Sequence, residues 1–149
     1  AMRFSSVIFA TVLLLSPVAF ADGALQLDVI SKPFSPQKDA VLNAVNTNAK
    51  YSEISQADRA NIESSLVGIS DVLAGGKNMA SLDAPSRENI QSYQDSVNKL
   101  LVKAFRDSKL VCTKEAAIGS NMMKRVCKTA AARSRDNANV RANGIKVNQ

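Results

Sequence analysis

The chain has 149 residues, two cysteines, no histidine, no tryptophan and a formal net charge of +6 at neutral pH. This length suits a single domain with one modest hydrophobic core. The absence of histidine removes the commonest metal ligand and the usual general base, which disfavours metal-dependent and acid–base enzymes. We therefore expect a non-enzymatic protein that needs no cofactor.

Residues 1–21 have the pattern of an export signal. Met2 and Arg3 give a short basic start, and residues 7–15 (VIFATVLLL) form an apolar core. Ala19-Phe20-Ala21 then places small residues at the two positions that a signal peptidase reads. The apolar core is shorter than the roughly 20 residues that span a bilayer. We therefore expect cleavage after Ala21 and a mature protein that is periplasmic or secreted.

Charge is divided unevenly along the mature chain. Residues 22–98 carry six basic and ten acidic side chains, whereas residues 99–149 carry twelve basic and three acidic side chains. A basic half is typical of nucleic-acid-binding proteins, but an exported protein has little access to nucleic acid. The partners that we expect are a protein or an anionic envelope component, with at most peripheral contact with a membrane and no nucleic acid.

Residues 22–34 are expected to form an extended N-terminal segment outside the main domain. Leu25, Leu27 and Val29 alternate with other residues, but Pro33 and Pro36 follow closely. The segment is interpreted as free to move, and residues 35–143 as a single helical domain.

The first helix of this domain is expected to begin at Ser35-Pro36, because serine caps helices and proline is favoured in the first turn. It is predicted to be weak, since asparagine and threonine occupy many of its positions. Its apolar face is formed by Val41, Leu42, Val45 and Ala49.

The second helix has clearer boundaries. Ser55 is a suitable N-cap, Asp58 lies in the first turn, and Gly75-Gly76 favour a stop. Helical spacing gives one continuous apolar stripe: Ile62, Leu66, Ile69 and Leu73.

The third helix has the strongest amphipathic pattern of the chain and is expected to start near Asp83 or Ala84. Leu100, Leu101 and Phe105 are predicted to form the centre of the core. Its apolar face comprises Ile90, Tyr93, Val97, Leu100, Leu101, Ala104 and Phe105. Two interpretations stay open for Gln94 and Asp95: hydrogen bonds that orient the following hairpin, or plain surface.

Residues 109–128 are expected to form a β-hairpin that packs on the third helix. Gly119-Ser120 lies midway between Cys112 and Cys127, and two cysteines around a turn in an exported chain predict a disulfide. Closing this loop stabilises the fold by roughly 3 kcal/mol in the chain-entropy model. The register stays open, because a two-residue turn makes the cysteines a hydrogen-bonded pair and a wider loop changes that.

A basic helix is expected after the hairpin, over residues 129–143. Thr129 is a suitable cap and Asn143-Gly144 a stop, but large apolar residues are few. We expect this helix to dock loosely, followed by a disordered tail over residues 144–149.

The basic residues of the hairpin are the candidate site for an acidic partner or an anion. They are Lys109, Lys114, Lys124, Arg125 and Lys128. The alternative is a solvated rim, in which lysines only keep the strand edges from pairing with other chains.

No catalytic residue and no metal ligand is assigned. Ser120 beside Lys124 lacks the other parts of a nucleophilic site. Met122-Met123 lacks a further ligand for a soft metal and is expected to pack in the turn instead. An enzyme would need a cleft built from carboxylates. The carboxylates available for it are Glu88, Asp95, Asp107 and Glu115.

Residues 89–129 carry a pattern of residue types and spacings that extends over about a third of the mature chain. It comprises Asn98-Lys99-Leu100-Leu101, Asp107, Val111-Cys112, Gly119-Ser120, Val126-Cys127 and Thr129. This pattern resembles that of a group of small exported proteobacterial proteins with no assigned function, in which a Gln-Glu pair stands where this chain has Gln94-Asp95. The resemblance implies export and a helix followed by a disulfide hairpin. It implies no reaction, substrate or catalytic residue.

The sequence therefore predicts a mainly α fold with three helices, a disulfide-closed β-hairpin and a basic C-terminal helix. The function expected is the non-enzymatic binding of a protein or an anionic surface of the bacterial envelope. The alternative is a small secreted enzyme inhibitor or effector.

Overall fold

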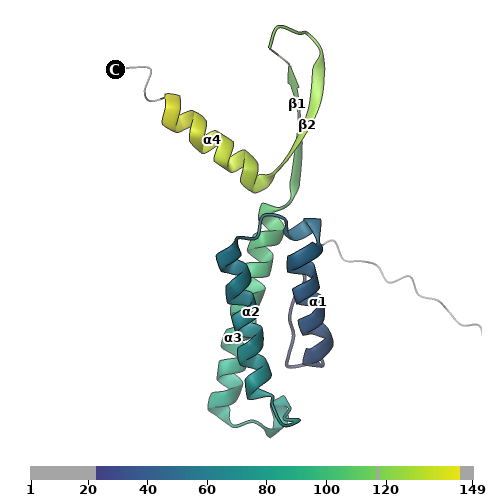
Figure 1. Ribbon diagram of the computed structural model, residues 1–149, viewed down its shortest axis with the longest axis vertical. Coiled ribbons are helices and arrows are strands. Elements are labelled where there is room, and N and C mark those ends of the chain that lie inside the picture. The colour runs from purple at the N-terminus through teal and green to yellow at the C-terminus, as the bar shows by residue number, and fades with distance from the viewer. Residues whose placement is uncertain (1–22, 117, 145–149) are drawn as a thin grey trace, which may run out of the picture.

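The computed structural model describes residues 23–116 and 118–144 (Figure 1). The predicted export signal and residues 145–149 of the predicted tail lie outside the described residues. Three helices, α1 (Phe34–Thr47), α2 (Gln56–Val72) and α3 (Ala84–Asp107), form a bundle with two short 3₁₀ turns at Ala49–Tyr51 and Met79–Ser81. Strands β1 (Leu110–Ala116) and β2 (Met123–Thr129) and helix α4 (Ala130–Gly144) follow. The predicted mainly helical fold with a hairpin is confirmed.

The long helices begin and end where local sequence signals predict. The Ser55 hydroxyl accepts a hydrogen bond from the Asp58 backbone N–H at 3.0 Å and caps α2. Gly75 and Gly76 follow the helix with φ of 78° and 76°, in the left-handed region that glycine tolerates. Helix α1 differs slightly, since it begins at Phe34 without a side-chain cap and takes Pro36 into its first turn.

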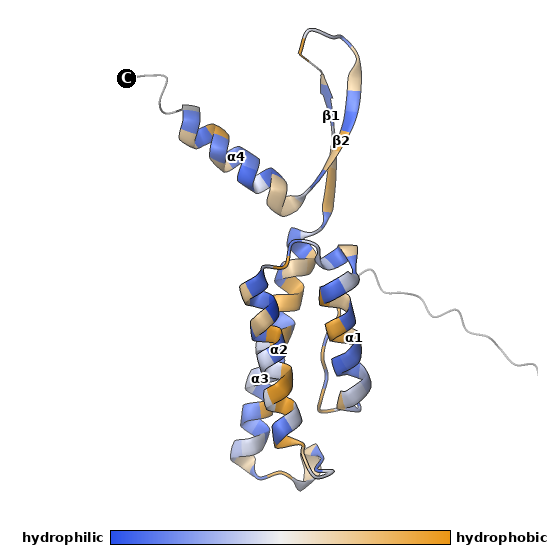
Figure 2. Cartoon of the chain, viewed as in Figure 1, coloured by the Kyte–Doolittle hydropathy of each residue, from blue (hydrophilic) through white to orange (hydrophobic). Residues whose placement is uncertain are grey.

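The core lies between the three helices of the bundle, where hydrophobic residues gather in Figure 2. Leu101 is fully buried as expected, whereas Leu100 and Phe105 are only partly buried against the cluster. The centre of the core is therefore nearer the middle of α3 than predicted. The largest fully buried side chains are Leu27, Val41, Ile62, Leu66, Ile69, Ile90, Val97 and Leu101.

The N-terminal segment is part of this core, so the prediction of a segment outside the domain is wrong. Leu27 and Val29 are buried. The Asn98 side chain holds the Leu27 backbone at both groups, accepting from its N–H at 2.7 Å and donating to its carbonyl at 2.9 Å. Gln94 Oε1 accepts a hydrogen bond from the Val29 N–H at 2.7 Å. Gln94 thus orients this segment rather than the hairpin, and Asp95 is exposed.

Two different periods match at this contact. Two residues of extended chain advance by about 6.6 Å, and four residues of helix advance by about 6 Å. Leu27 and Val29 can therefore meet Asn98 and Gln94, which are one helical turn apart. The inward alternation of the segment then supplies apolar side chains to the core.

The hairpin extends beyond the end of α3 and does not pack on it, in contrast to the prediction (Figure 1). Every residue of β1 and β2 is exposed or only partly buried. The physical reason is that neither face of the hairpin carries a continuous row of large apolar side chains that a helix would cover. Among the described residues, no helix combines the length and the apolar character needed to cross a membrane.

Candidate binding surface

Strands β1 and β2 and helix α4 form a projecting unit, here called the arm (residues 110–144), which stands on one end of the bundle (Figure 1). Its sequence carries seven basic and two acidic residues, whereas residues 23–109 carry ten of each sign. The arm is therefore strongly basic on a neutral bundle. Such a separation of charge favours contact with anionic partners.

The predicted disulfide is present and closes the hairpin. Cys112 and Cys127 are directly opposite in the antiparallel register, with their Cα atoms 4.0 Å apart. The Ala130 N–H donates to the Lys109 carbonyl at 2.9 Å, so these two residues form a hydrogen-bonded pair. Hydrogen-bonded and non-hydrogen-bonded pairs alternate along antiparallel strands. The cysteines therefore form a non-hydrogen-bonded pair, where the strands come closest, and the open question of register is resolved.

The turn is wider than two residues. The strands end at Ala116 and Met123, which face each other in the register. Gly119 has φ of 78°, and the Ser120 hydroxyl accepts a hydrogen bond from the Met122 N–H at 3.1 Å. Ser120 thus takes part in a local turn, as its neighbour Gly119 predicts.

The register divides the predicted basic residues between two faces of the hairpin. Lys114 lies directly opposite Arg125, on the face that carries the disulfide. Lys124 lies on the other face, opposite Glu115. In the described part of the chain, neither Lys114 nor Arg125 has an ion-pair partner. Two like charges directly across a strand pair destabilise the pair.

The remaining two predicted site residues, Lys128 and Lys109, lie beside other elements of the protein. Lys128 Nζ lies 2.6 Å from Asp136 Oδ2 on α4. This hydrogen bond raises the pKa of Lys128 and lowers that of Asp136. Lys109 lies at the base of the arm, beside Phe105. Of the five predicted residues, Lys114, Lys124 and Arg125 are the ones that lie between the disulfide and the turn.

Helix α4 is held to the base of the hairpin by polar contacts. The Thr129 hydroxyl accepts from the Ala132 N–H at 3.1 Å, which confirms Thr129 as the cap. The Arg133 guanidinium donates to the Thr113 hydroxyl at 3.0 Å and to the Val111 carbonyl at 3.4 Å. The first turn of the helix therefore lies against the base of the hairpin on the face opposite the disulfide, and the rest of α4 points away from the strands (Figure 1). The face with Lys114 and Arg125 stays open.

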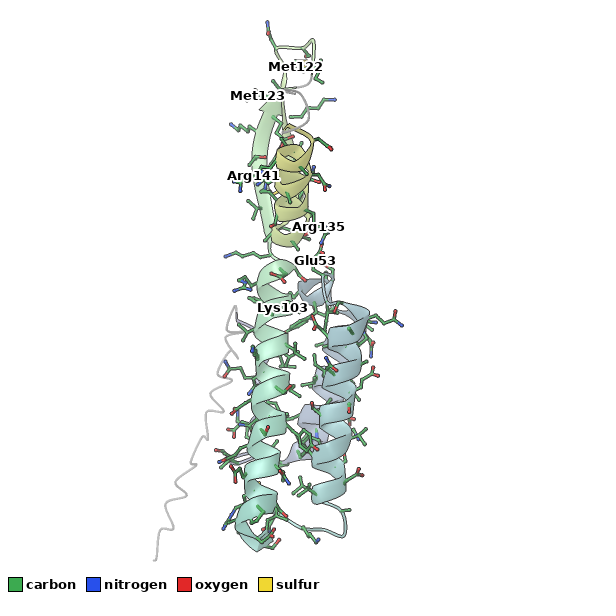
Figure 3. All side chains as sticks on the ribbon, turned by 90° about the vertical axis from the view of Figure 1, so that its left-hand side faces the viewer. Glu53, Lys103, Met122, Met123, Arg135 and Arg141 are labelled. Atoms are coloured by element: carbon green, nitrogen blue, oxygen red, sulfur yellow. A yellow bond between two sulfur atoms is a disulfide. The ribbon has the colours of Figure 1, made fainter. Side chains whose placement is uncertain are left out.

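Glu53, in the turn before α2, joins the arm to the bundle (Figure 3). It accepts hydrogen bonds from the Thr129 hydroxyl at 2.5 Å and from both terminal nitrogens of Arg135 at 2.9 and 3.3 Å. Its backbone N–H donates to the buried Ser108 hydroxyl at the end of α3. The hydrogen bonds from Arg135 and Thr129 lower the pKa of the Glu53 carboxyl. No spacing in the sequence singles out this residue, because its partners are 76 and 82 positions away.

The far end of the arm carries three exposed apolar side chains. Ile118 is fully exposed, and Met122 and Met123 are 74% and 60% exposed. Figure 3 shows both methionines at the end of the hairpin that is remote from the bundle. The expectation that they pack in the turn is wrong, since the hairpin carries no other element near its tip.

A small open cavity of about 280 Å³ lies at the base of the arm. Lys50 Nζ lies 5.9 Å from the centre of the Phe105 ring at this place. The cavity is at the lower limit of typical ligand sites, which have volumes of roughly 300–1,000 Å³. It is lined by Ala49, Lys50, Phe105, Ser108, Lys109 and Leu110.

The four carboxylates considered for a catalytic cleft do not come together. Glu88, Asp95 and Asp107 are distributed along the 24 residues of α3, and Glu115 lies on β1. Within residues 23–116 and 118–144, no three His, Cys, Asp or Glu side chains group closely enough to hold a metal ion.

Fold and surface together define a small helical bundle that carries a basic, disulfide-closed arm. No protein-family model, curated protein or solved structure shows significant similarity to the chain. The resemblance to small exported proteobacterial proteins therefore stays a prediction from the pattern of residues 89–129.

Proposed function

We propose that this protein is an exported, non-enzymatic binding protein whose arm binds an anionic component of the bacterial envelope. The observation that carries the proposal is the cross-strand pair of Lys114 and Arg125. Two unpaired like charges at the closest approach of two strands weaken the hairpin. An anion bound between them would remove this cost, so the pair favours binding over stability.

The arm is suited to present this pair. The disulfide holds the strands together two positions away, so the repulsion between Lys114 and Arg125 does not open the hairpin. The absence of net charge on the bundle leaves the arm as the most positive part of the molecule. A disulfide also agrees with an oxidising compartment such as the periplasm.

The proposal is tested by capture of envelope components with the oxidised, mature protein. The variant K114Q/R125Q removes the pair and is expected to lose binding, while its thermal stability stays equal or rises slightly. Lys128 is left intact because it pairs with Asp136 on α4, so its loss would change a contact within the arm as well as the charge. The matched control R87Q/K99Q removes two charges from exposed positions on α3 and is expected to bind normally.

Binding that persists in K114Q/R125Q would overturn the proposal. Binding that both double variants lose equally would assign the effect to net charge rather than to the arm. The alternative of a secreted inhibitor or effector predicts capture of one soluble target enzyme or host protein in place of an envelope component. Mass spectrometry of the native protein tests the proposed cleavage after Ala21.

A further inference from the structure

We infer that the tip of the arm inserts into an anionic lipid surface, an assignment that rests on the proposed function and names its partner. The apolar residues of the tip are Ile118, Met122 and Met123, three large side chains that are 60% exposed or more, and Gly119, Ser120 and Asn121 lie between them in the turn. Exposing such a group on a monomer is unfavourable in water and marks an interaction site. The question is which partner fits its shape and surroundings.

The charges lie at the depth that a membrane interface requires. Lys124 follows Met123, and Arg125 with its opposite residue Lys114 comes one position further from the tip. At about 3.4 Å per residue, these cations lie roughly 3–7 Å behind Met123. Interfacial segments bury their apolar residues by roughly 5–10 Å while their lysines and arginines stay among the headgroups. We call Lys114, Lys124 and Arg125 the basic collar. The order of apolar tip and basic collar along the arm matches this arrangement.

One acidic residue belongs to the collar. Glu115 lies opposite Lys124 and accepts a hydrogen bond from the Thr113 hydroxyl at 2.9 Å. The collar nevertheless has three basic residues against this one. Its net charge is complementary to a negatively charged surface.

The shape of the tip favours lipid over a folded protein. It is the convex end of a two-stranded hairpin with three apolar side chains, whereas a typical protein interface takes roughly 20–30 residues a side. A bilayer accepts a convex protrusion without a matching pocket. Methionine also adapts its shape to irregular apolar surroundings. The disulfide orders the strands in advance, which reduces the entropy lost on insertion.

The chain offers a clean optical test because it contains no tryptophan. Ile118→Trp places a single fluorophore at the tip, and Val140→Trp places one at a 70% exposed position on α4 as the matched control. The probes are vesicles of phosphatidylcholine alone and of phosphatidylcholine with phosphatidylglycerol. With the anionic vesicles, we expect a blue shift and quenching by brominated acyl chains for I118W. Neither effect is expected for V140W or for neutral vesicles.

A label-free measurement accompanies this test. In vesicle sedimentation, M122S/M123S is expected to weaken binding about tenfold or more, since burial of one methionine side chain exceeds the free energy of a tenfold change. Val140→Ser is the control and is expected to bind as the wild type does. K114Q/R125Q in the I118W background is expected to abolish the blue shift.

The outcomes separate this inference from the proposed function. An I118W spectrum that anionic vesicles leave unchanged overturns the lipid assignment. If envelope capture still depends on Lys114 and Arg125 in that case, the proposed function stands with a different partner. Equal shifts for I118W and V140W would also overturn the assignment, because they would indicate adsorption of the whole arm. Capture of one soluble protein through the tip would replace lipid by protein as the partner.

Discussion

Replacing Glu53 by alanine tests the joint between the bundle and the arm. The change removes the acceptor of the Thr129 hydroxyl and the partner of Arg135. A hydrogen bond to a charged acceptor contributes about 1.5 kcal/mol. The Arg135 pair adds little, because its guanidinium is 61% exposed and screened by solvent. We therefore expect the opening of α4 to become about tenfold more frequent.

Amide hydrogen exchange measures this effect segment by segment. In Glu53→Ala, the amides of α4 and of the first residues of β1 are expected to exchange about tenfold faster than in the wild type. The amides of α2 and α3 are expected to change little, since their protection comes from the core. Glu63→Gln, at an exposed position on α2, is the control. Equal acceleration in the bundle and the arm would refute the assignment of Glu53 as a local joint.

Acidity should have the same effect as the substitution. The pKa of Glu53 is lowered in the folded protein, so folding favours the ionised carboxylate. This stabilisation is complete above the ordinary value of 4.5 and is lost as the pH falls through the lowered value. The difference in α4 exchange between wild type and Glu53→Gln should therefore shrink in acid. A difference that stays constant across this range would contradict the role of the carboxylate charge.

Three further changes test the core, the N-terminal segment and the hairpin. Leu101→Ala should destabilise the bundle by roughly 2–5 kcal/mol, because it is a large-to-small change at a fully buried site. A melting temperature within a degree or two of the wild type would place Leu101 outside the core. Asn98→Ala leaves the Leu27 backbone groups unpaired and should lower the free energy of unfolding by about 2–4 kcal/mol. Amide exchange at residues 25–29 should become faster, whereas the exposed control Ser96→Ala should leave it unchanged. An unchanged exchange rate in Asn98→Ala would contradict the docking of the N-terminal segment on α3. C112S/C127S should lower the stability of the hairpin by roughly 3 kcal/mol. Adding K114Q/R125Q should restore more stability to this variant than to the oxidised protein. No gain in either background would show that the like-charge pair does not weaken the hairpin, and an equal gain in both would show that the disulfide does not restrain the repulsion.

The parts of the fold that depend on neighbouring residues could be predicted from the sequence. Ser55, Gly75-Gly76 and Thr129 fix helix ends through contacts within a few positions, and these signals have the same effect in any context. The paired cysteines around Gly119 likewise determine a hairpin by spacing. The core stripe of α2 follows from its 3.6-residue period.

The parts that depend on distant polar contacts could not be predicted. Asn98 binds Leu27 across 71 positions, and an asparagine beside an apolar stripe looks like ordinary surface in a sequence. The end of α3 from which the arm projects is joined to the turn before α2 by Ser108 and Glu53, which are 55 positions apart in the sequence. A hydrophobic pattern could not reveal either contact, because each hydrogen bond joins a polar side chain to a backbone group and neither partner contributes to the hydropathy of the sequence.

Stability is distributed unevenly between the bundle and the arm. The bundle buries its apolar residues, and side-chain amides satisfy the backbone of its docked N-terminal segment. The arm buries little apolar surface, and the contacts that hold its described residues in shape are the disulfide, the Lys128–Asp136 ion pair, the hydrogen bonds of Arg133 and the contacts of Glu53. If evolution had selected the arm for stability, an acidic residue opposite Arg125 in place of Lys114 would have been a simple improvement. The like-charge pair, next to exposed apolar side chains, is the arrangement that contact with an anionic partner would need, and it makes K114Q/R125Q the substitution that best separates binding from folding.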